Sequence, residues 1–382
     1  MRVLLFGTYD TRLHPRFGAL AEGLREHGVD TAECNAPLGL DTAARVRLLA
    51  EPWRLPAMAA RLANRWAALA WRARGWRGLG WQRPDAVAVG YLGHFDVHLA
   101  RLLFPRTPIV LDHLVSASGT GRDRGLDGGP RKALLRWIDA TALRAADIVV
   151  VDTEEHRETL PDRYRGRAVV VPVGAPAAWF REETPPDGGP LRVVFFGLYT
   201  PLQGTPVIGE ALALIADADG GAGAGVEVTM IGTGQDYAAT RAAAEGNDRV
   251  QWLDWVPGAR LPALVAGHHV CLGIFGTGDK ARRVVPNKVF QGAAAGCAIV
   301  TSDTPPQRRT LGDDAILVPP GDAKALAGAL LDLAGDRAAL HAARGRARSR
   351  AERAFAPGAV VAPLMSRLES GPRGRRATPA TR

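Results

Sequence analysis

The chain has 382 residues, of which 47% are hydrophobic and 23% are charged. This composition excludes a disordered chain, and the length predicts two domains, because single cores rarely grow beyond about 250–300 residues. The net charge of +9 indicates an anionic partner, either a phosphorylated ligand or a membrane surface. Nucleic acid is not expected as a partner, since the sequence has no zinc-finger spacing and no RNA-binding aromatic motif.

The N-terminus and the cysteines indicate where the protein resides. The opening segment MRVLLFGTYD has a short apolar run that leads into a turn, so we interpret it as a first strand and not as a signal peptide. No apolar run reaches the roughly 18–20 residues that span a bilayer. Cys34, Cys271 and Cys297 are widely spaced and form neither a disulfide framework nor a zinc pattern. We therefore expect a cytoplasmic protein.

Short apolar runs alternate with helix-like segments through the first half of the chain. The predicted strands are 3–7, 86–90, 108–112, 147–152 and 168–173, and the predicted helices include 15–27, 95–104 and 130–146. Continuous apolar strands separated by helices predict a parallel sheet that is covered on both faces. In such a sheet, ligands bind at the carboxyl ends of the strands.

The same alternation starts again in the second half. Its predicted strands are 191–197, 226–232, 249–256, 270–275, 297–302 and 315–319. The stretch EETPPDGGP at 182–190 is rich in Pro, Gly and acidic residues, which is typical of a surface linker. We therefore expect an α/β protein with two Rossmann-like, doubly wound parallel-sheet lobes that face a central cleft, where small molecules commonly bind.

The expected domain boundaries follow from these patterns. The five parts are an N-terminal lobe at 1–175, a linker at 176–190, a C-terminal lobe at 191–350, a C-terminal helix at 351–368 and a disordered basic tail at 369–382. The tail is polar, contains Pro and Gly, and shows no periodicity, as disordered termini do.

The segment KARRVVPNKVFQGAAAGCAIVTSD at 280–303 joins four cations to a helix-like run, a glycine and an apolar strand. The cations are Lys280, Arg282, Arg283 and Lys288. Cations and backbone N–H groups at the start of a helix form an anion-binding site. A phosphorylated ligand is therefore expected to bind in the second half of the chain.

A Trp-rich and Arg-rich stretch admits two interpretations. Met58, Leu62, Trp66 and Leu69 share one face of a predicted helix, and Arg61, Arg65 and Arg72 form an adjoining stripe. Residues 58–77 fit an interfacial helix that rests on anionic lipid. They also fit a lobe helix that buries its apolar face while its Arg side chains reach water.

Four segments in this order resemble the retaining family 4 glycosyltransferases, which have the GT-B fold. They are GLYTPLQG (197–204), IGTG (231–234), PNKVFQGAAAGCAIVTSD (286–303) and LVPPGDAKALAGALLDLAGD (317–336). The resemblance covers most of residues 1–368 and is strongest at 191–335. It implies that the C-terminal lobe binds a nucleotide sugar and the N-terminal lobe binds the acceptor.

The sequence departs from the family at the donor site. Leu198 and Gln203 stand where the family often has Arg and Lys, and Arg283 and Gln291 stand at its Glu-x7-Glu pair. The chain thus resembles a Pro-Asn-Lys subgroup without those carboxylates. Arg283 can supply positive charge that the 197–204 loop lacks, and the Gln291 amide can still bond a ribose hydroxyl.

The resemblance implies the following donor residues. For the donor phosphates we expect Lys288, Arg283, Arg282 and backbone amides near Gly204 and Thr205; for the nucleotide, Gly232, Gly234, Asn287 and Gln291. Positive charge at these positions would stabilise the leaving diphosphate. Because no convincing Asp-x-Asp motif is present, we expect transfer without a metal and without any other cofactor.

The acceptor is expected at the loop GTYDTRLHPRF (7–17), through Tyr9, Asp10, His14 and Arg16. The run from His14 to Arg16 fits equally well as the start of the first helix. Asp112 and His113 follow the 108–112 strand and are the catalytic candidates. A front-face retaining mechanism needs no protein nucleophile, so His113 would orient the sugar; His94 is its rival.

The expected function is that of a glycosyltransferase, a hexosyltransferase by family, which retains configuration and acts on a small-molecule, glycan or lipid-linked acceptor. Membrane contact through 58–77 would place the protein on the inner face of the membrane and favour a lipid-linked acceptor. Two alternatives stay open. One is another GT-B activity, such as a sugar-nucleotide epimerase. The other is a pair of degenerate lobes that binds nucleotide sugar and assists a partner protein.

Overall fold

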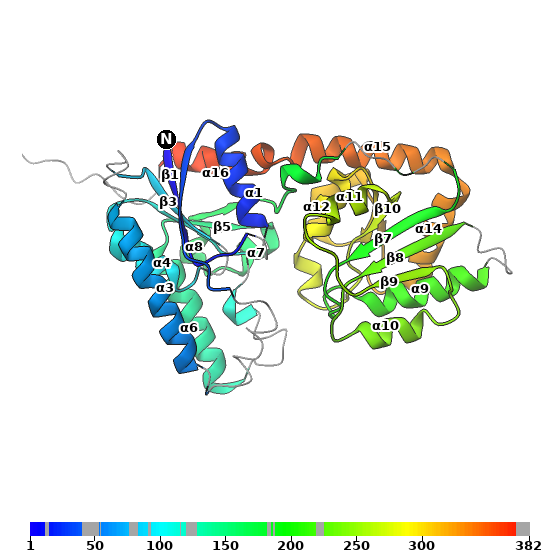
Figure 1. Cartoon of the computed structure of the whole chain (residues 1–382), viewed down its shortest axis with the longest axis horizontal. Helices are drawn as coiled ribbons and strands as arrows, with labels where there is room; N and C mark the ends of the chain where they lie inside the picture. The colour runs from blue at the N-terminus through cyan, green and yellow to red at the C-terminus, as the bar shows by residue number, and fades with distance from the viewer. Residues whose placement is uncertain are drawn as a thin grey trace, which may run out of the picture. The chain divides into compact units, whose positions relative to one another are not determined.

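The computed structural model describes residues 1–11, 15–39, 53, 55–75, 83–90, 93–114, 116–119, 128–181, 185, 188–218 and 225–371. The chain forms two compact units. Unit 1 comprises residues 1–172 and 360–382, and unit 2 comprises residues 173–359 (Figure 1). Unit 1 is therefore built from both ends of the chain.

Unit 1 contains a six-stranded parallel sheet with the order β2-β1-β3-β4-β5-β6. The strands are β1 (Arg2–Gly7), β2 (Asp30–Asn35), β3 (Ala86–Val89), β4 (Ile109–Asp112), β5 (Ile148–Val151) and β6 (Ala168–Val170). The central strands β3, β4 and β5 are buried throughout, as their continuous apolar sequences predict.

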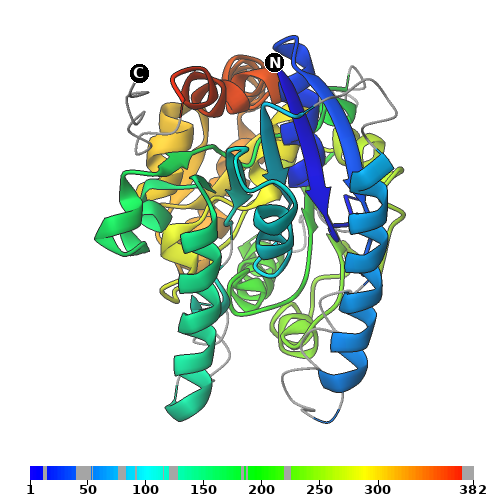
Figure 2. The same ribbon diagram turned by 90° about the vertical axis from the view of Figure 1, so that its left-hand side faces the viewer.

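Helices cover both faces of this sheet. One layer holds α3 (Leu55–Gly75), α4 (Asp96–Leu103) and α6 (Gly129–Ala145), which Figure 2 shows in front of the strands. Leu69, Val97 and Leu143 from this layer share a core with strand residues. The other layer includes α1 (Arg16–Glu26) and α16 (Pro357–Glu369). The short helices α7 (Glu154–Thr159) and α8 (Asp162–Arg165) lie between β5 and β6 in the sequence.

Unit 2 repeats this plan with the strand order β12-β11-β10-β7-β8-β9, and every described pairing is parallel. The strands are β7 (Leu191–Phe196), β8 (Val226–Ile231), β9 (Val250–Leu253), β10 (Val270–Leu272), β11 (Ala298–Ser302) and β12 (Ile316–Val318). The predicted α/β class with two doubly wound parallel sheets is confirmed.

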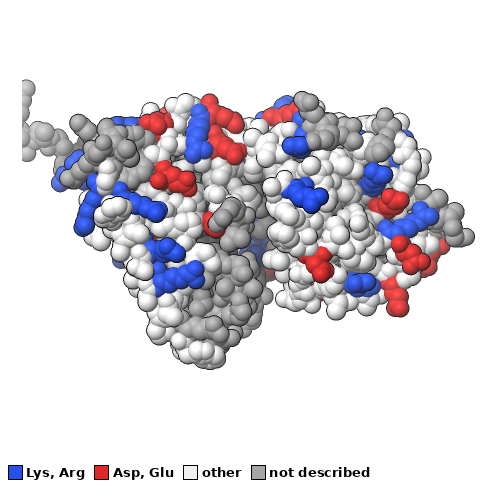
Figure 3. All heavy atoms as spheres, viewed as in Figure 1, with Lys and Arg blue, Asp and Glu red and all other residues white. Residues whose placement is uncertain are grey.

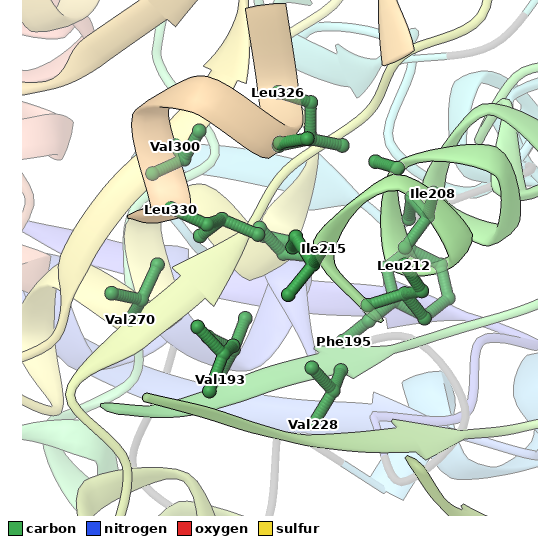
Figure 4. Close-up of a cluster of buried hydrophobic side chains, with 14 of the residues drawn as sticks. Val193, Phe195, Ile208, Leu212, Ile215, Val228, Val270, Val300, Leu326 and Leu330 are labelled. Carbon is green, nitrogen blue, oxygen red and sulfur yellow. The ribbon is translucent and has the colours of Figure 1, made fainter. Parts of the chain in front are cut away.

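Apolar helix faces form the core of unit 2. Helices α9 (Thr205–Ala218) and α14 (Ala323–Gly335) pack on one face of the sheet. Figure 4 shows Ile208, Leu212 and Leu330 pointing toward strand residues such as Val193 and Phe195. Each fully buried side chain of this size contributes about 1.5–3 kcal/mol to stability.

Shorter helices complete unit 2 and surround the ends of its strands. They are α10 (Tyr237–Ala243), α11 (Leu261–Ala266), α12 (Asn287–Ala294) and α13 (Pro305–Leu311), with single 3₁₀ turns η3 (Ala177–Trp179), η4 (Ala281–Arg283) and η5 (Gly312–Asp314). Helix α12 begins directly after Pro286, within the helix-like run predicted in 280–303.

The last two helices belong to different units. Helix α15 (Arg337–Ala354) packs against α12 and β11 of unit 2 and buries Ala347 and Ala351. Helix α16 instead places Val361, Leu364 and Met365 in the core of unit 1, beside Phe17 and Leu20 of α1. None of the helices that the structure describes is long and apolar enough to cross a bilayer.

Candidate functional site

Lys288 lies where three elements of unit 2 meet. It is the second residue of α12, and only 4% of its surface is exposed. Its Nζ atom donates a hydrogen bond of 2.6 Å to Oε1 of Gln203 and lies 3.5 Å from the centre of the Phe195 ring. A Cβ atom on Gly197 would come within 3.1 Å of the same Nζ atom. The ammonium group thus joins α12 to the end of β7 and to the 197–204 loop.

This ammonium group has no acidic partner in the part of the chain that the structure describes. Burial lowers the pKa of Lys288 well below its usual 10.5. A buried charge without a counter-ion is unfavourable, and an ammonium group offers three N–H donors, of which the Gln203 bond uses one. An anionic ligand would therefore find both charge and donors here.

The two glycines of the 231–234 turn let two loops pack backbone to backbone. A Cβ atom on Gly232 would lie 2.0 Å from the carbonyl oxygen of Gly197, and one on Gly234 would lie 2.4 Å from that of Tyr199. The Gly232 amide already donates to the carbonyl of Leu253. These glycines position the loop that contacts Lys288, and their direct contact with a nucleotide stays a prediction.

Gly204 and Thr205 also fix the loop. Gly204 has a φ of 63°, and its amide donates to the carbonyl of Thr200. A Cβ atom at this position would lie 2.4 Å from the backbone nitrogen of Gly276. Thr205 is fully buried, and its hydroxyl accepts a hydrogen bond of 2.8 Å from Thr240. The Gly204 amide and the Thr205 hydroxyl therefore each have a hydrogen-bond partner within unit 2.

The other donor-side candidates differ in exposure. Arg282 is exposed, whereas Arg283 is half-buried and forms an ion pair of 3.0 Å with Asp279. Asn287 is exposed at the first position of α12. Gln291 is 6% exposed and follows Lys288 by three residues, so the two side chains share one helix face. The structure brings Lys288, Gln203 and Gly197 into contact and places Gln291 one turn further along.

A pocket of 690 Å³ opens elsewhere in unit 2, between α9 and the loop that precedes α14. Glu210, Asp217, Asp322 and Lys324 line it. It contains none of the expected site residues, and its three carboxylates would repel a phosphate. This pocket therefore does not suit a diphosphate.

In unit 1, Arg16 and Asp112 form one buried ion pair. Nε of Arg16 donates to Oδ1 of Asp112 at 3.0 Å, Nη2 of Arg16 donates to the carbonyl of Val171, and both side chains are 2% exposed. Burial raises the pKa of Asp112, and the Arg16 guanidinium opposes that shift. The acceptor-side candidate and the catalytic candidate thus meet in an interaction that joins α1 to β4.

Tyr9, another acceptor-side candidate, faces inward. It is 5% exposed, its hydroxyl donates to Oε1 of Glu33 at 2.7 Å, and its ring lies 4.5 Å from that of Phe17. Asp10 is partly exposed. His14 lies outside the described residues.

His113 and His94, the alternative candidate, both lie close to the carboxylate of Asp139, which was not predicted from the sequence. The Nε2 atoms of His94 and His113 lie 3.2 and 3.8 Å from Oδ1 of Asp139, and the two rings are 5.2 Å apart. All three residues are buried. His113 points to the face of the sheet opposite Asp112, since successive residues of a strand alternate between faces. Asp139 precedes the apolar Ala142 and Leu143 by three and four residues on α6. This spacing, which places Asp139 on the apolar face of the helix, is the one signal of its burial that the sequence offers.

Asp139 also holds the residues that follow β4. Its carboxylate accepts hydrogen bonds from the amides of Ala117 and Ser118 at 2.8 and 3.0 Å and from Oγ of Ser118 at 2.6 Å. Burial alone would raise the pKa of Asp139, but the groups of His113, His94 and Ser118 outweigh it and hold the pKa well below its usual range. Burial and the neighbouring His94 lower the pKa of His113.

Helix α3 has an inner and an outer face. Leu69 is fully buried, and Nε1 of Trp66 donates to Oδ1 of Asp96 at 2.8 Å. Asp96 also accepts hydrogen bonds from the amide and hydroxyl of Thr8, which follows β1. Trp71, by contrast, is 75% exposed. Lys and Arg side chains gather over the region of α3 and α4 on the face shown in Figure 3.

Comparisons with known proteins agree with this architecture. The family model described as "Glycosyl transferases group 1" matches residues 190–336, within unit 2. The solved structures of sucrose-phosphate synthase from Thermosynechococcus elongatus and of Anabaena HepE in complex with UDP-glucose both align with a TM-score of 0.65, at 16% and 14% identity. The alignments cover 97% of this chain in both cases and 98% and 100% of those chains. The fold is GT-B.

A third similar structure leads to the same conclusion. Trehalose 6-phosphate synthase from Burkholderia multivorans aligns with a TM-score of 0.60 at 18% identity, over 97% of this chain and 98% of that chain. At these identities the likeness establishes the GT-B fold alone. Comparison of the sequence with curated proteins gives no match.

Proposed function

We propose that the protein transfers a sugar from a nucleoside-diphosphate donor to an acceptor and that Lys288 binds the diphosphate. The buried ammonium group of Lys288, which has no acidic partner among the described residues, carries this proposal. The family match over 190–336 includes Lys288 and the 197–204 loop, and the GT-B fold is compatible with the same reaction. A phosphate oxygen beside Gly197 would supply the missing negative charge.

The chemistry requires stabilisation of the leaving group. Negative charge develops on the diphosphate as the glycosidic bond breaks, and a fixed cation lowers the energy of that state. Loss of one such donor typically slows a reaction by about 10²–10³-fold. Lys288, assisted by Arg282 and Arg283, would supply this charge, so we propose that no metal is needed at the diphosphate.

We further propose that the configuration of the sugar is retained. The departing phosphate would take the proton of the acceptor on the same face of the sugar, and no protein nucleophile is required. Gln291 would bond the ribose, with Asn287, Gly232 and Gly234 beside the nucleotide. In unit 1, His113 would orient the sugar, and this role requires its Nε2 atom to turn away from Asp139.

Unit 1 would bind the acceptor. The solvent-exposed face of α3 favours an acceptor at an anionic lipid surface: residues 55–75 contain four Arg and no acidic residue, and Trp71 is 75% exposed. Failure of the protein to bind anionic vesicles, in the experiment described below, would favour a soluble acceptor instead. A cytoplasmic location fits both acceptors.

The test combines binding and turnover. UDP and a panel of nucleotide sugars are titrated calorimetrically into the protein, into Lys288→Met and into the control Lys324→Met, whose lysine is exposed on α14. We expect loss of donor binding only in Lys288→Met, and slow release of nucleoside diphosphate from the bound donor by the unaltered protein. Equal binding by both variants would contradict the phosphate role of Lys288.

One result would favour a different function. The Glu-x7-Glu carboxylates are absent, and Arg283 is paired with Asp279. If donor binds without release of nucleoside diphosphate under any acceptor, the protein is a nucleotide-sugar-binding partner and not a transferase. Interconversion of the bound sugar into its epimer would identify the third alternative.

A further inference from the structure

We propose that His94, His113 and Asp139 bind one divalent transition-metal ion in unit 1, with Zn²⁺ as the best match. The three side chains come from the turn before α4, from the residue after β4 and from α6, and their ligand atoms lie within 4.8 Å of one another. This site is separate from the diphosphate site, which lies in unit 2.

The spacing of the ligand atoms suits such an ion. Zn²⁺ lies about 2.0–2.1 Å from His nitrogen and carboxylate oxygen, so neighbouring ligands of a tetrahedral site are about 3.3 Å apart. The two Nε2 atoms lie 3.2 and 3.8 Å from Oδ1 of Asp139, and the three atoms all lie within 4.8 Å of one another. A movement of the rings by about 1 Å would complete the coordination geometry.

A second observation that supports an ion is the lack of hydrogen-bond partners at the Nε2 atoms of His94 and His113. Both Nε2 atoms are buried and lack a hydrogen bond of normal geometry. Each Nε2 atom nevertheless lies close to Oδ1 of Asp139, at 3.2 Å for His94 and 3.8 Å for His113. One metal ion bound by all three atoms would satisfy both nitrogen atoms and the carboxylate.

The surroundings of Asp139 match those of metal-binding carboxylates. Its oxygens are already held by Ser118 and by the amide of Ala117, and such outer hydrogen bonds orient a ligand toward the ion. Two His and one carboxylate suit Zn²⁺ and leave a fourth position for water or for an oxygen of a ligand. The ion would hold the ends of β3 and β4 against α6.

The proposal has a consequence for His113. A metal-bound Nε2 atom cannot turn toward a sugar, so the metal-ligand role would replace the sugar-orienting role proposed above for His113, and the metal titration described below decides between the two. The test of the metal site measures metal binding and not turnover, so its result does not depend on the proposed transferase activity.

The experiment uses the full chain, freed of metal by a chelator and dialysed. Zn²⁺ is titrated against a chromophoric chelator, and Co²⁺ is added separately as a spectroscopic probe. We expect one equivalent of Zn²⁺ to bind, an intense visible Co²⁺ spectrum typical of a tetrahedral site, and X-ray absorption of the Zn²⁺ form that shows two imidazole ligands. Asp139→Asn and His94→Gln should each weaken binding by at least about 100-fold.

His156→Gln is the matched control, because His156 of unit 1 is likewise paired with an aspartate, Asp152. It should leave the affinity unchanged. Absence of stoichiometric binding by the unaltered protein would overturn the proposal, as would an octahedral Co²⁺ spectrum or equal affinity in all variants. The spectra of the unaltered protein decide the question even if a variant fails to fold.

Discussion

Lys288, a buried lysine without a carboxylate partner among the described residues, is the residue on which the proposed donor site depends. Its side chain lies between Gly197, Gln203 and the Phe195 ring. Such a group is held at a cost to the free energy of folding, because removing an ammonium group from water is unfavourable. An anionic ligand would offset that cost when it binds, because it pairs with the buried charge.

Replacement of Lys288 by Met should therefore stabilise the ligand-free protein while removing donor binding. Methionine keeps much of the apolar stem and removes the buried charge, an exchange that is often neutral or stabilising by about 1–4 kcal/mol. We expect a higher melting temperature without UDP and no further increase with UDP. Thermal unfolding with and without UDP measures both effects; a lower melting temperature without UDP would show that the Gln203 bond outweighs the burial cost.

The lowered pKa of Lys288 also predicts a linkage between donor binding and protons. In the free protein the lysine loses its proton below the usual 10.5, and a bound diphosphate would raise the pKa again. Donor affinity should therefore fall as the pH rises through the lowered pKa of the free protein, and binding should take up a proton in the window between the two values. Calorimetry in buffers with different ionisation enthalpies measures this uptake. Lys288→Arg should abolish it.

The sequence predicts Lys288 because a Pro-Asn-Lys helix start is a local pattern. Asp96 and Asp139 are different, since each is an acid on a helix whose partners lie 21–88 residues away in the sequence. Only the tertiary fold brings those partners into contact. Nothing in the local sequence distinguishes a buried helical carboxylate from an exposed one. The same reason hides the pairing of Arg16 with Asp112, although the sequence nominates both residues.

At the scale of elements, the two faces of α3 bear on the two interpretations of the Trp-rich stretch. Its inner face is occupied by Trp66 and Leu69, which agrees with a lobe helix packed on its sheet. Its outer face still presents Trp71 among Arg side chains, so inward packing and lipid contact are compatible.

We expect the protein to bind vesicles that contain anionic lipid and to dissociate as salt is raised, because exposed charges are screened. Trp71→Ser combined with Arg61→Gln and Arg65→Gln should reduce the bound fraction in a vesicle sedimentation assay. Trp255→Ser is the control, since that residue of unit 2 is also 75% exposed. Failure of the unaltered protein to sediment with anionic vesicles at low salt would remove the lipid-contact hypothesis.

Loop packing at the end of β7 yields a stability prediction. Gly232→Ala would place a Cβ atom 2.0 Å from the Gly197 carbonyl oxygen, at a φ of 122°. We expect a loss of about 1–3 kcal/mol in unfolding free energy together with weaker UDP binding, because the loop beside Lys288 must move. Gly258→Ala, at a position with open space, should change neither quantity. Chemical denaturation and UDP titration of both variants provide the comparison.

The differences between predicted and observed elements have tertiary causes. The strand predicted at 270–275 ends at Leu272, since Phe275 leaves the sheet and its amide donates to the carbonyl of Gln203. The edge strand β2 was not predicted, because DTAECN lacks the apolar run of a central strand. Continuous apolar sequence identifies buried parallel strands well and edge strands poorly.

At the scale of the whole molecule, both lobes were predictable but the destination of the last helix was not. The sequence predicts a C-terminal helix at 351–368, and its pattern does not indicate which core receives it. The structure places Val361, Leu364 and Met365 against α1, so the final helix belongs to unit 1.

Leu364→Ala should therefore destabilise unit 1 selectively. Truncation of a buried leucine costs about 2–5 kcal/mol, and Leu364 is 2% exposed. We expect an earlier unfolding transition for unit 1, followed through the tryptophans of that unit, and an unchanged Kd for UDP at unit 2. Ser366→Ala, at an exposed position of the same helix, is the control. A change in UDP affinity equal to the change in stability would show that the two units do not unfold separately.

Because α16 belongs to unit 1, the structure also determines the order in which the two units can complete their folding during synthesis. During synthesis, residues 173–359 emerge as one uninterrupted stretch, so unit 2 needs no later residue to close its core. Unit 1 begins earlier but is completed only after α16 has also emerged. Until then, the side of its sheet near Phe17 and Leu20 lacks its covering helix and is exposed to chaperones and to aggregation.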